Sequence, residues 1–229
     1  MPVYQLGKEI GFPHPNEARE DGLLAVGGDL SSKRLLTAYS LGIFPWFDEH
    51  SDILWWSPNP RLILFPENFK LQKSLSRTIK KEKYQVFFDT NFPAVIENCS
   101  QIPRKDEEGT WLTKEMKKAY IDLFEQGYAH SLEVYENNEL IGGLYGIALG
   151  KVFFGESMFF KKSNASKVAL YYLCQELKIW GFHFIDAQVE TNHLLKLGAE
   201  KIERNVFLKR LEAALIHPTC KGKWTKNII

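Results

Sequence analysis

The chain has 229 residues, of which 45% are hydrophobic and 25% are charged, and its net charge at pH 7 is +1. This composition excludes a disordered chain, and the balanced charge excludes a general attraction to nucleic acid or to anionic membranes. The cysteines Cys99, Cys174 and Cys220 are far apart and odd in number, so they indicate neither a disulfide framework nor a zinc site. No segment reads as a signal peptide or a membrane span, and we expect a cytoplasmic protein without membrane contact.

The first part of the chain, residues 1 to about 62, is rich in glycine, proline and aromatic residues. Ser31 or Ser32 can cap a helix over residues 33–41, because a side-chain hydroxyl accepts from the free N–H groups of the first turn. Residues 61–65 follow two prolines and are predicted to form a strand.

Residues 71–84 form the clearest predicted amphipathic helix, with Leu71, Leu75 and Ile79 on its apolar side. Its other side collects the cations Lys73, Arg77, Lys80 and Lys81. Such a run is usually a solvated face, but so many cations with a single acid nearby also fit contact with phosphate.

The rest of the chain alternates between the periods of strands and helices. A helix over 114–126, capped by Thr113, precedes a predicted hairpin of residues 129–136 and 140–149. The predicted elements after this hairpin are a strand over 151–160, a helix capped by Ser163 or Asn164 that ends at Gly181, a strand over 182–189 and a short helix ending near Ala199. The tail after residue 216 reads as loosely packed.

Strand, strand, helix, strand, helix is the order of the GNAT-type acyltransferase fold. We therefore predict an α+β fold with a GNAT-like catalytic domain over residues 63–229 behind a smaller N-terminal α+β domain over residues 1–62. A fold does not give a function, so the site is argued separately.

Polar residues interrupt two of the apolar strands. Asp186 and Gln188 are two apart and would share one strand face, which makes a polar centre out of a carboxylate and an amide. Glu156 lies in the preceding strand. An equally good interpretation is that the carboxylate and the amide are a buried hydrogen-bonded pair that orders the sheet, since buried carboxylates are rare unless paired.

The turn before the long helix disfavours binding of acetyl-CoA. A pyrophosphate needs free backbone N–H groups at a helix N-terminus, usually from a glycine-rich turn, and residues 161–165 contain no glycine. Phosphate-loop, HExxH and GxSxG motifs are absent from the sequence as well, so we expect no cofactor and no metal. The acyl group must then arrive activated, as it does in aminoacyl-tRNA. Tryptophans that stack on unpaired bases, with Trp46, Trp55 and Trp56 close in sequence, would fit that donor.

Across nearly its whole length the chain resembles the bacterial leucyl/phenylalanyl-tRNA–protein transferases. The resemblance rests on these segments: GLLAVGGDLS, AYSLGIFPWF, LWWSPNPR, GTWLTKEM, GYAHSLEV, GGLYGIALGKVFFGESMF, ASKVAL, and IDAQV followed by HLLKLGA. It implies transfer of Leu or Phe from Leu-tRNA or Phe-tRNA to acceptor proteins that begin with Arg or Lys. The transfer marks those proteins for degradation by the N-end rule, and we expect the enzyme to be a monomer.

The resemblance also assigns residues to roles. Trp46 and Trp111 would hold the terminal adenosine, Glu156 would contact the cationic acceptor, and the basic helix would contact tRNA. Asp186 and Gln188 would be the catalytic pair, with Gln188, oriented by Asp186, positioning the attacking amine and assisting its loss of a proton. The apolar pocket for the Leu or Phe side chain would be formed by Leu144, Phe153, Met158, Leu173 and Ile185.

Two rival functions remain open from the sequence. One is a GNAT-type acetyltransferase, which would bind acetyl-CoA; the missing glycine turn argues against this function. An RNA-binding module would explain the tryptophans and cations but would leave Asp186, Gln188 and Glu156 without a purpose. His130 and His193 fit structural hydrogen-bonding roles better than that of a general base.

Overall fold

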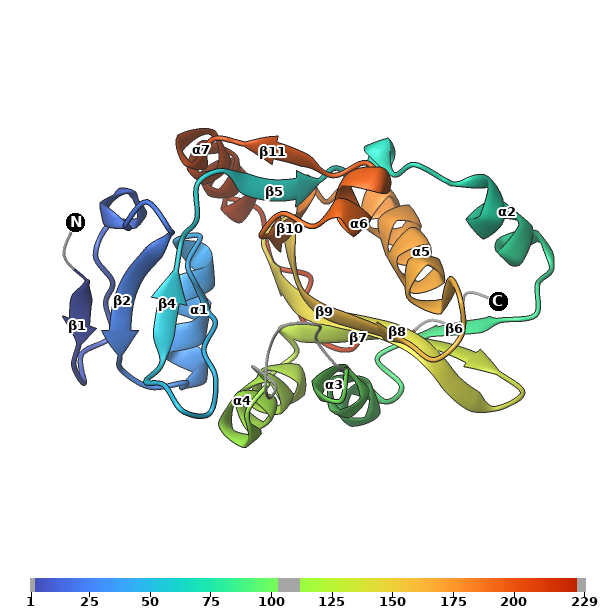
Figure 1. Cartoon of the computed structure of the whole chain (residues 1–229), viewed down its shortest axis with the longest axis horizontal. Helices are drawn as coiled ribbons and strands as arrows, with labels where there is room; N and C mark the ends of the chain where they lie inside the picture. The colour runs from blue at the N-terminus through green and yellow to red at the C-terminus, as the bar shows by residue number, and fades with distance from the viewer. Residues whose placement is uncertain (1–2, 103–111, 226–229) are drawn as a thin grey trace.

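The computed structural model describes residues 3–102 and 112–225, and these residues form two β-sheets (Figure 1). The smaller sheet lies at the left of that view and is built from the first part of the chain. Its strand order is β1 (Tyr4–Leu6), β2 (Leu23–Gly27), β4 (Leu54–Trp56) and β3 (Phe44–Pro45). Helix α1 (Ser32–Ser40) packs on this sheet through Leu35, Ala38 and Tyr39, which are fully buried. The helix begins where predicted, since the hydroxyl of Ser31 accepts from the N–H of Arg34.

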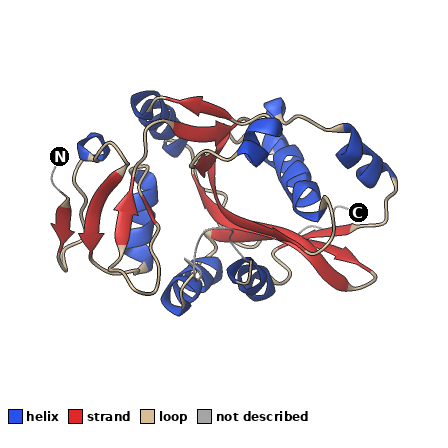
Figure 2. Cartoon of the chain, in the orientation of Figure 1, coloured by secondary structure: helices blue, strands red, loops and turns tan. Residues whose placement is uncertain are grey.

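The larger sheet carries the rest of the architecture (Figure 2). Its order is β11 (Glu200–Ile202), β5 (Arg61–Leu64), β10 (Phe184–Gln188), β9 (Val152–Phe160), β8 (Glu139–Leu149), β7 (Ala129–Glu136) and β6 (Gln85–Phe88). All neighbours pair antiparallel except β9 and β10, which run parallel. The hairpin predicted for β7 and β8 is confirmed, with Asn137 and Asn138 both at positive φ in its turn.

Helices cover both faces of this sheet, which explains why β8 and β9 read as nearly continuous apolar runs. Helices α3 (Phe92–Ser100) and α4 (Lys114–Glu125) pack on one face, and α5 (Ala165–Ile179) packs on the other (Figure 1). A Cβ added at Gly142 of β8 would lie 2.5 Å from the Cβ of Ala165, so glycine lets the start of α5 lie directly on the strand. The remaining helices are the 3₁₀ turns η1 (Pro15–Glu17) and η2 (Pro66–Asn68), and α2 (Lys73–Lys80), α6 (Asn192–Lys196) and α7 (Arg204–Leu215). None of the helices in residues 3–102 and 112–225 is long and apolar enough to cross a bilayer.

Three predictions of local structure were wrong in part. Helix α2 is shorter than predicted, and Leu71 lies outside it and is 45% exposed instead of on an apolar helix face. Asn164 precedes α5 but adopts φ 67°, and its side chain donates to Thr78 Oγ1 instead of capping the helix. The tail is not loose, because Trp224 is 6% exposed and its ring stacks 3.6 Å from that of His130.

The strand β5 straddles the predicted division of the chain at residues 62 and 63. It belongs to the larger sheet, while the preceding strand β4 belongs to the smaller one. The short connection between them carries the chain from one sheet to the other. The division into 1–62 and 63–229 stays a prediction.

Candidate aminoacyl-transfer site

The site begins where β9 and β10 separate. The two strands pair in parallel only from Phe184 opposite Val152 to Asp186 opposite Phe154. Beyond that point β9 continues along β8, whereas β10 ends at Gln188. A cavity of about 370 Å³ opens between the diverging strands and α5.

Apolar side chains predicted for the Leu or Phe pocket all line this cavity: Leu144, Phe153, Met158, Leu173 and Ile185. Four of them are at most 3% exposed, and Met158 is half-buried near the mouth. The structure adds further apolar side chains that sequence reasoning missed, among them Leu64, Leu170 and Leu194. An unbranched Met among leucines lets the wall adapt to side chains of different shape.

A β-bulge aims Glu156 at the mouth of the cavity. In the β8–β9 ladder Gly155 pairs with Gly146 and Ser157 pairs with Tyr145, so Glu156 is the extra residue. Glycine is required opposite the bulge, because a Cβ at Gly146 would lie 2.2 Å from the carbonyl oxygen of Phe154.

A second bulge aims Gln188 from the other strand. In the β10–β5 ladder Asp186 pairs with Ile63 and Gln188 pairs with Leu62, which leaves Ala187 as the extra residue. Gln188 takes φ 63°, a left-handed conformation that is uncommon outside glycine and is found where function holds a residue in place. The two bulges bring the side chains together, and Gln188 Nε2 donates to Glu156 Oε1 over 2.8 Å.

Asp186 faces away from this pair, into a buried ion pair. Its oxygens accept from Arg61 Nε at 2.8 Å and Nη2 at 2.6 Å, and both side chains are at most 1% exposed. The guanidinium also lies 4.8 Å from the centre of the Phe44 ring and 4.6 Å from that of Phe207. Asp186 still reaches Gln188 through the backbone, since its Oδ1 accepts from the Gln188 N–H at 3.0 Å.

The predicted geometry of the pair is therefore corrected. Asp186 and Gln188 do not present their side chains together on one face, because the bulge at Ala187 breaks the period of two. Asp186 orients Gln188 by fixing its backbone. Arg61 was missed, although a lone Arg in the apolar run RLILF and a lone Asp in FIDAQ are the signal of a buried pair between two strands.

Two tyrosines complete the polar centre around Glu156. Tyr39 OH donates to Glu156 Oε1 at 2.8 Å, Tyr120 OH donates to Oε2 at 2.6 Å, and the two hydroxyl oxygens are 2.6 Å apart. Tyr39 comes from α1 and Tyr120 from α4, so both parts of the chain build this centre. The tyrosines gave no signal in the sequence, because a buried Tyr in a helix is usually a core residue.

The protons in this cluster are consistent with a neutral Glu156. The three oxygen–oxygen contacts, two between a tyrosine and Glu156 and one between the tyrosines, each need a proton. The two tyrosine hydroxyls supply two protons, and a protonated Glu156 would supply the third. Burial raises the pKa of Glu156 to about 7, and the charge of Asp186 also raises it, against the opposing effect of the hydrogen bonds from Tyr120, Tyr39 and Gln188. The carboxyl group is thus close to half-protonated near neutral pH.

Of the two residues predicted to hold the adenosine, the structure describes Trp46, which is not among the residues that line this cavity. Trp46 follows β3, is half-buried, and has its ring centre 5.9 Å from that of Trp56. Trp111 lies outside the described residues. Trp55 is fully buried, and its Nε1 donates to Gly27 O, so it is a core residue and cannot stack on RNA.

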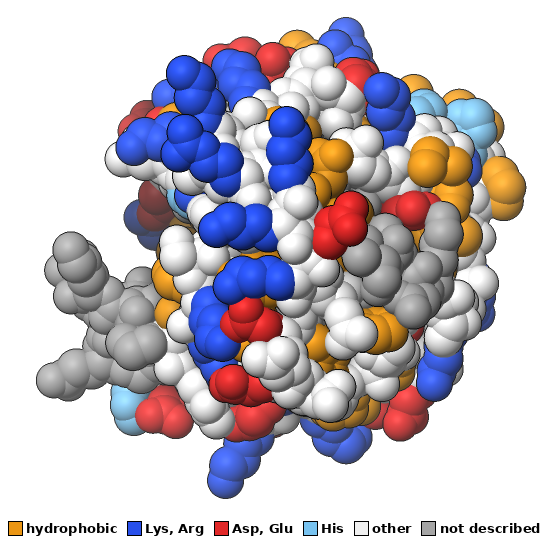
Figure 3. Space-filling model, turned by 90° about the vertical axis from the view of Figure 1, so that its right-hand side faces the viewer, with side chains coloured by type: hydrophobic (Ala, Val, Ile, Leu, Met, Phe, Trp, Pro, Cys, Tyr) orange, Lys and Arg blue, Asp and Glu red, His pale blue; other side chains and the backbone are white. Residues whose placement is uncertain are grey.

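The predicted tRNA-binding cations lie apart from the cavity as well. Lys73, Arg77, Lys80 and Lys81 are all exposed, on α2 and at its end. Figure 3 shows the side of the molecule on which α2 lies, with Lys and Arg side chains gathered on part of it. None of the four forms an ion pair within residues 3–102 and 112–225, so their charges are available to a partner.

The histidines considered as bases differ in setting. His130 is fully buried and bonded to Asp89 Oδ2 at 2.9 Å, and burial lowers its pKa, so it is a structural residue. His193 lines the mouth of the cavity and is exposed.

Comparison with known proteins gives the family. A model described as leucyl/phenylalanyl-tRNA protein transferase matches residues 63–212, and the model of that family's N-terminal domain matches residues 28–59. The chain belongs to the leucyl/phenylalanyl-tRNA–protein transferase family. The predicted enzyme class, a tRNA-dependent aminoacyltransferase, and the predicted α+β fold with a separate N-terminal domain are confirmed.

Curated members of this family match the chain from end to end. The transferase from Desulfatibacillum aliphaticivorans is 53% identical over 98% of this chain and 97% of its own length. The transferase from Syntrophus aciditrophicus is also 53% identical, over 99% of this chain and 95% of its own length. Among solved structures, a GCN5-related N-acetyltransferase from Kribbella flavida covers 72% of this chain and 58% of its own, at 8% identity and a TM-score of 0.37, too low to carry an argument.

Proposed function

We propose that this transferase moves Leu or Phe from Leu-tRNA or Phe-tRNA to the N-terminal Arg or Lys of acceptor proteins and forms a peptide bond. The observation that carries the proposal is the apolar cavity of about 370 Å³ with the Gln188–Glu156 pair at its mouth. Its size is in the range of small-ligand pockets, which runs from about 300 to 1,000 Å³. The apolar lining suits a Leu or Phe side chain, and the polar mouth suits the ester and amine that react.

In the reaction, the α-amine of the acceptor attacks the ester carbonyl that joins the amino acid to the ribose. The C–N bond forms, the C–O bond to the ribose breaks, and the amine proton ends on the ribose oxygen that leaves. Because an α-amine has a pKa of about 7.7–8.0, much of it is already neutral near pH 7 and needs mainly to be positioned.

Gln188 is the residue we assign to positioning that amine. Its Nε2 donates to Glu156, which leaves the amide oxygen free to accept an N–H of the attacking amine. Asp186 and Arg61 act through Gln188. Arg61 holds the carboxylate of Asp186, and that carboxylate accepts the backbone N–H of Gln188.

Glu156 is the acidic contact we assign to the cationic acceptor. In its ionised form Glu156 accepts three hydrogen bonds, and a carboxylate has about four acceptor positions, so one remains for a cation. A charge-assisted contact in this half-buried setting would favour acceptors that begin with Arg or Lys.

The donor tRNA is assigned to two further surfaces. Trp46, together with Trp111, would hold the terminal adenosine by stacking, and the exposed cations of α2 would contact phosphates of the tRNA body. We further expect the enzyme to act in the cytoplasm, where charged tRNA is made. Its predicted monomeric state stays a prediction.

The test is transfer of radiolabelled leucine or phenylalanine from charged tRNA to a model protein that begins with Arg. A protein that begins with Gly is the acceptor control, and acetyl-CoA is the donor control. Label on the Arg protein alone supports the proposal and ranks the two amino acids. Charged tRNA that binds without transfer, or acetylation of the acceptor, would overturn it.

A further inference from the structure

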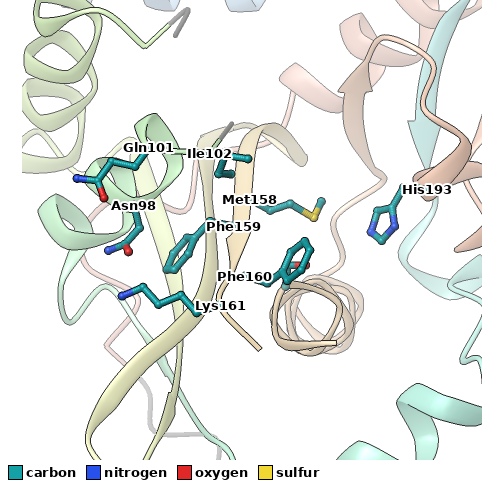
Figure 4. Close-up of a pocket in the computed structure, with 9 residues that line it drawn as sticks. Asn98, Gln101, Ile102, Met158, Phe159, Phe160, Lys161 and His193 are labelled. Atoms are coloured by element: carbon teal, nitrogen blue, oxygen red, sulfur yellow. The ribbon is translucent and has the colours of Figure 1, made fainter. Parts of the chain in front are cut away.

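A second cavity, of about 510 Å³, adjoins the aminoacyl cavity, and the assigned roles leave it without an occupant. It lies between the end of α3, the end of β9 and α6 (Figure 4). In that view Asn98 and Gln101 lie on one side and His193 on the other, with Met158 and Phe160 between them. Met158 and His193 line both cavities, so the two cavities adjoin at these side chains.

The lining of this second cavity suits a nucleotide. Phe160 is 65% exposed, an unusual state for a large aromatic side chain on a strand whose other residues are buried or half-buried. An exposed ring is a platform on which an unpaired base stacks. Asn98 and Gln101 each donate one amide N–H within the chain, to Ala94 O and to Glu97 Oε1, so their other N–H and the amide oxygen remain for a base edge. Lys161 supplies a cation for phosphate.

The second cavity differs in the charge of its lining from a third cavity, which lies beside the smaller sheet. Lys161 lines the second cavity, and Lys167 and Lys196 lie close enough to His193 to lower its pKa, after the larger effect of burial. Described lining residues of this cavity include no acid. The third cavity, next to the segment that follows Trp46, is lined instead by three acids, Asp48, Glu49 and Glu115, and one cation, Lys114. An RNA strand therefore suits the second cavity better than the third.

The position of the second cavity also suits an RNA strand. In Figure 1, α2 and the smaller sheet lie at opposite ends of the molecule, with β9 and α5 between them. Asn164 joins the start of α5 to α2 by its bond to Thr78 Oγ1, and Lys161 lies three residues before it. A strand that runs from α2 past Lys161 reaches the aminoacyl cavity, with Trp46 beyond.

We infer that the second cavity binds the unpaired nucleotide that precedes the terminal adenosine of the aminoacyl-tRNA. The base of this nucleotide stacks on Phe160, and its phosphate lies near Lys161. The inference rests on the proposed function, because it needs the amino acid of the same tRNA in the first cavity. The terminal ribose then spans the shared wall at Met158.

The test compares two donors, of which only the second carries this nucleotide. One is adenosine carrying phenylalanine on its ribose, and the other is a trinucleotide copy of the tRNA 3′ end carrying the same phenylalanine. Phe160→Ala is expected to lower kcat/KM for the trinucleotide about tenfold, mainly through KM, which is the usual loss for one stacked base. With the adenosine donor the same variant is expected to match the wild type. Lys161→Ala is expected to weaken the salt dependence of kcat/KM for the trinucleotide alone.

Matched controls are Ile216→Ala, which removes a side chain that is 81% exposed, and Lys209→Ala on α7. Neither is expected to change the ratio of the two donors. Equal losses with both donors, or no loss with either, would overturn the inference. A rise in KM for the acceptor alone would assign the cavity to the acceptor chain and would also overturn it. A wild-type enzyme that transfers from neither these donors nor charged tRNA would overturn the proposed function itself.

Discussion

Gln188 and Glu156 are joined side chain to side chain over 2.8 Å, although they belong to strands that stop pairing two residues earlier. Each lies beside or in a β-bulge, and the bulges turn both side chains toward the mouth of the aminoacyl cavity. The contact fixes the amide of Gln188 with its oxygen free.

Gln188→Ala is expected to lower kcat about 100-fold with little change in stability, because the attacking amine loses the group that positions it. Single-turnover transfer from charged tRNA to an Arg-starting protein measures the effect. Gln85→Ala, at an exposed position of β6, is the matched control. Wild-type kcat in Gln188→Ala would refute the assigned role.

Asp186→Ala is expected to cost about 3–5 kcal/mol in the free energy of unfolding, because it leaves Arg61 buried without its partner. Urea unfolding measures this loss. The double variant Arg61→Met/Asp186→Leu removes both charges and is expected to recover much of the stability. Its kcat is expected to stay low, because the N–H of Gln188 still lacks its acceptor. Unchanged turnover of Asp186→Ala at saturating substrates would remove Asp186 from the mechanism.

The sequence predicted most elements of this fold, and its limits lie at particular residues. Ser31 before α1, Thr113 before α4 and the Asn137–Asn138 turn each act through neighbours in the chain, so local patterns were enough. The bulge at Glu156 depends on how β9 meets β8, which no local pattern records.

The site was predicted in the same uneven way. The apolar residues that line the aminoacyl cavity were named from the family resemblance, and the structure brings them together. Tyr39, Arg61 and Tyr120 were missed because each acts on a partner at least 36 residues away in the chain. Helix α2 begins only at Lys73, because Leu71 has no core to face, and hydrophobic spacing alone cannot reveal that.

Glu156 is expected to make stability fall as pH rises from about 4.5 to about 7. Burial raises its pKa from 4.5 to about 7 in the folded protein, so the folded state holds the proton more tightly than the unfolded one. The stabilisation is therefore complete below pH 4.5 and is lost as pH rises through 7, by about 3 kcal/mol at most. Glu156→Gln cannot titrate, and its stability relative to the wild type is expected to rise over this range. Parallel pH profiles of the two proteins in urea unfolding would contradict the shifted pKa.

The same substitution tests the acceptor contact. Glu156→Gln keeps the shape of the side chain but removes its charge, so the preference for Arg-starting over Gly-starting acceptors is expected to fall about tenfold or more. The kcat/KM values for the two acceptors, measured with one charged tRNA, give the preference directly. An unchanged preference would leave Glu156 a structural carboxyl group that holds Tyr39, Tyr120 and Gln188 in place.

Trp224 is expected to support the aminoacyl cavity from behind, through the tail that the sequence predicted to be loose. Its backbone N–H donates to Asp89 Oδ2 at 2.7 Å, and its ring lies 6.0 Å from that of Phe153 in the cavity wall. Trp224→Ala is expected to cost about 3–5 kcal/mol, as for other buried aromatic side chains. Thermal unfolding measures the loss, with Thr225→Ala as the exposed neighbouring control. A wild-type melting temperature for Trp224→Ala would show that the tail does not support the core.

The cations of α2 are expected to set the salt dependence of tRNA binding. Each phosphate contact that is lost lowers the slope of log K against log salt by about 0.9 on a duplex region. A variant with all four changed to Ala is therefore expected to bind tRNA more weakly at low salt and with a slope smaller by up to about 3–4. The residues changed are Lys73, Arg77, Lys80 and Lys81. The control variant removes four exposed lysines from other elements, namely Lys8, Lys33, Lys178 and Lys209. Because the control has the same net charge, an equal loss in both variants would mean that overall charge, not contact by α2, governs binding.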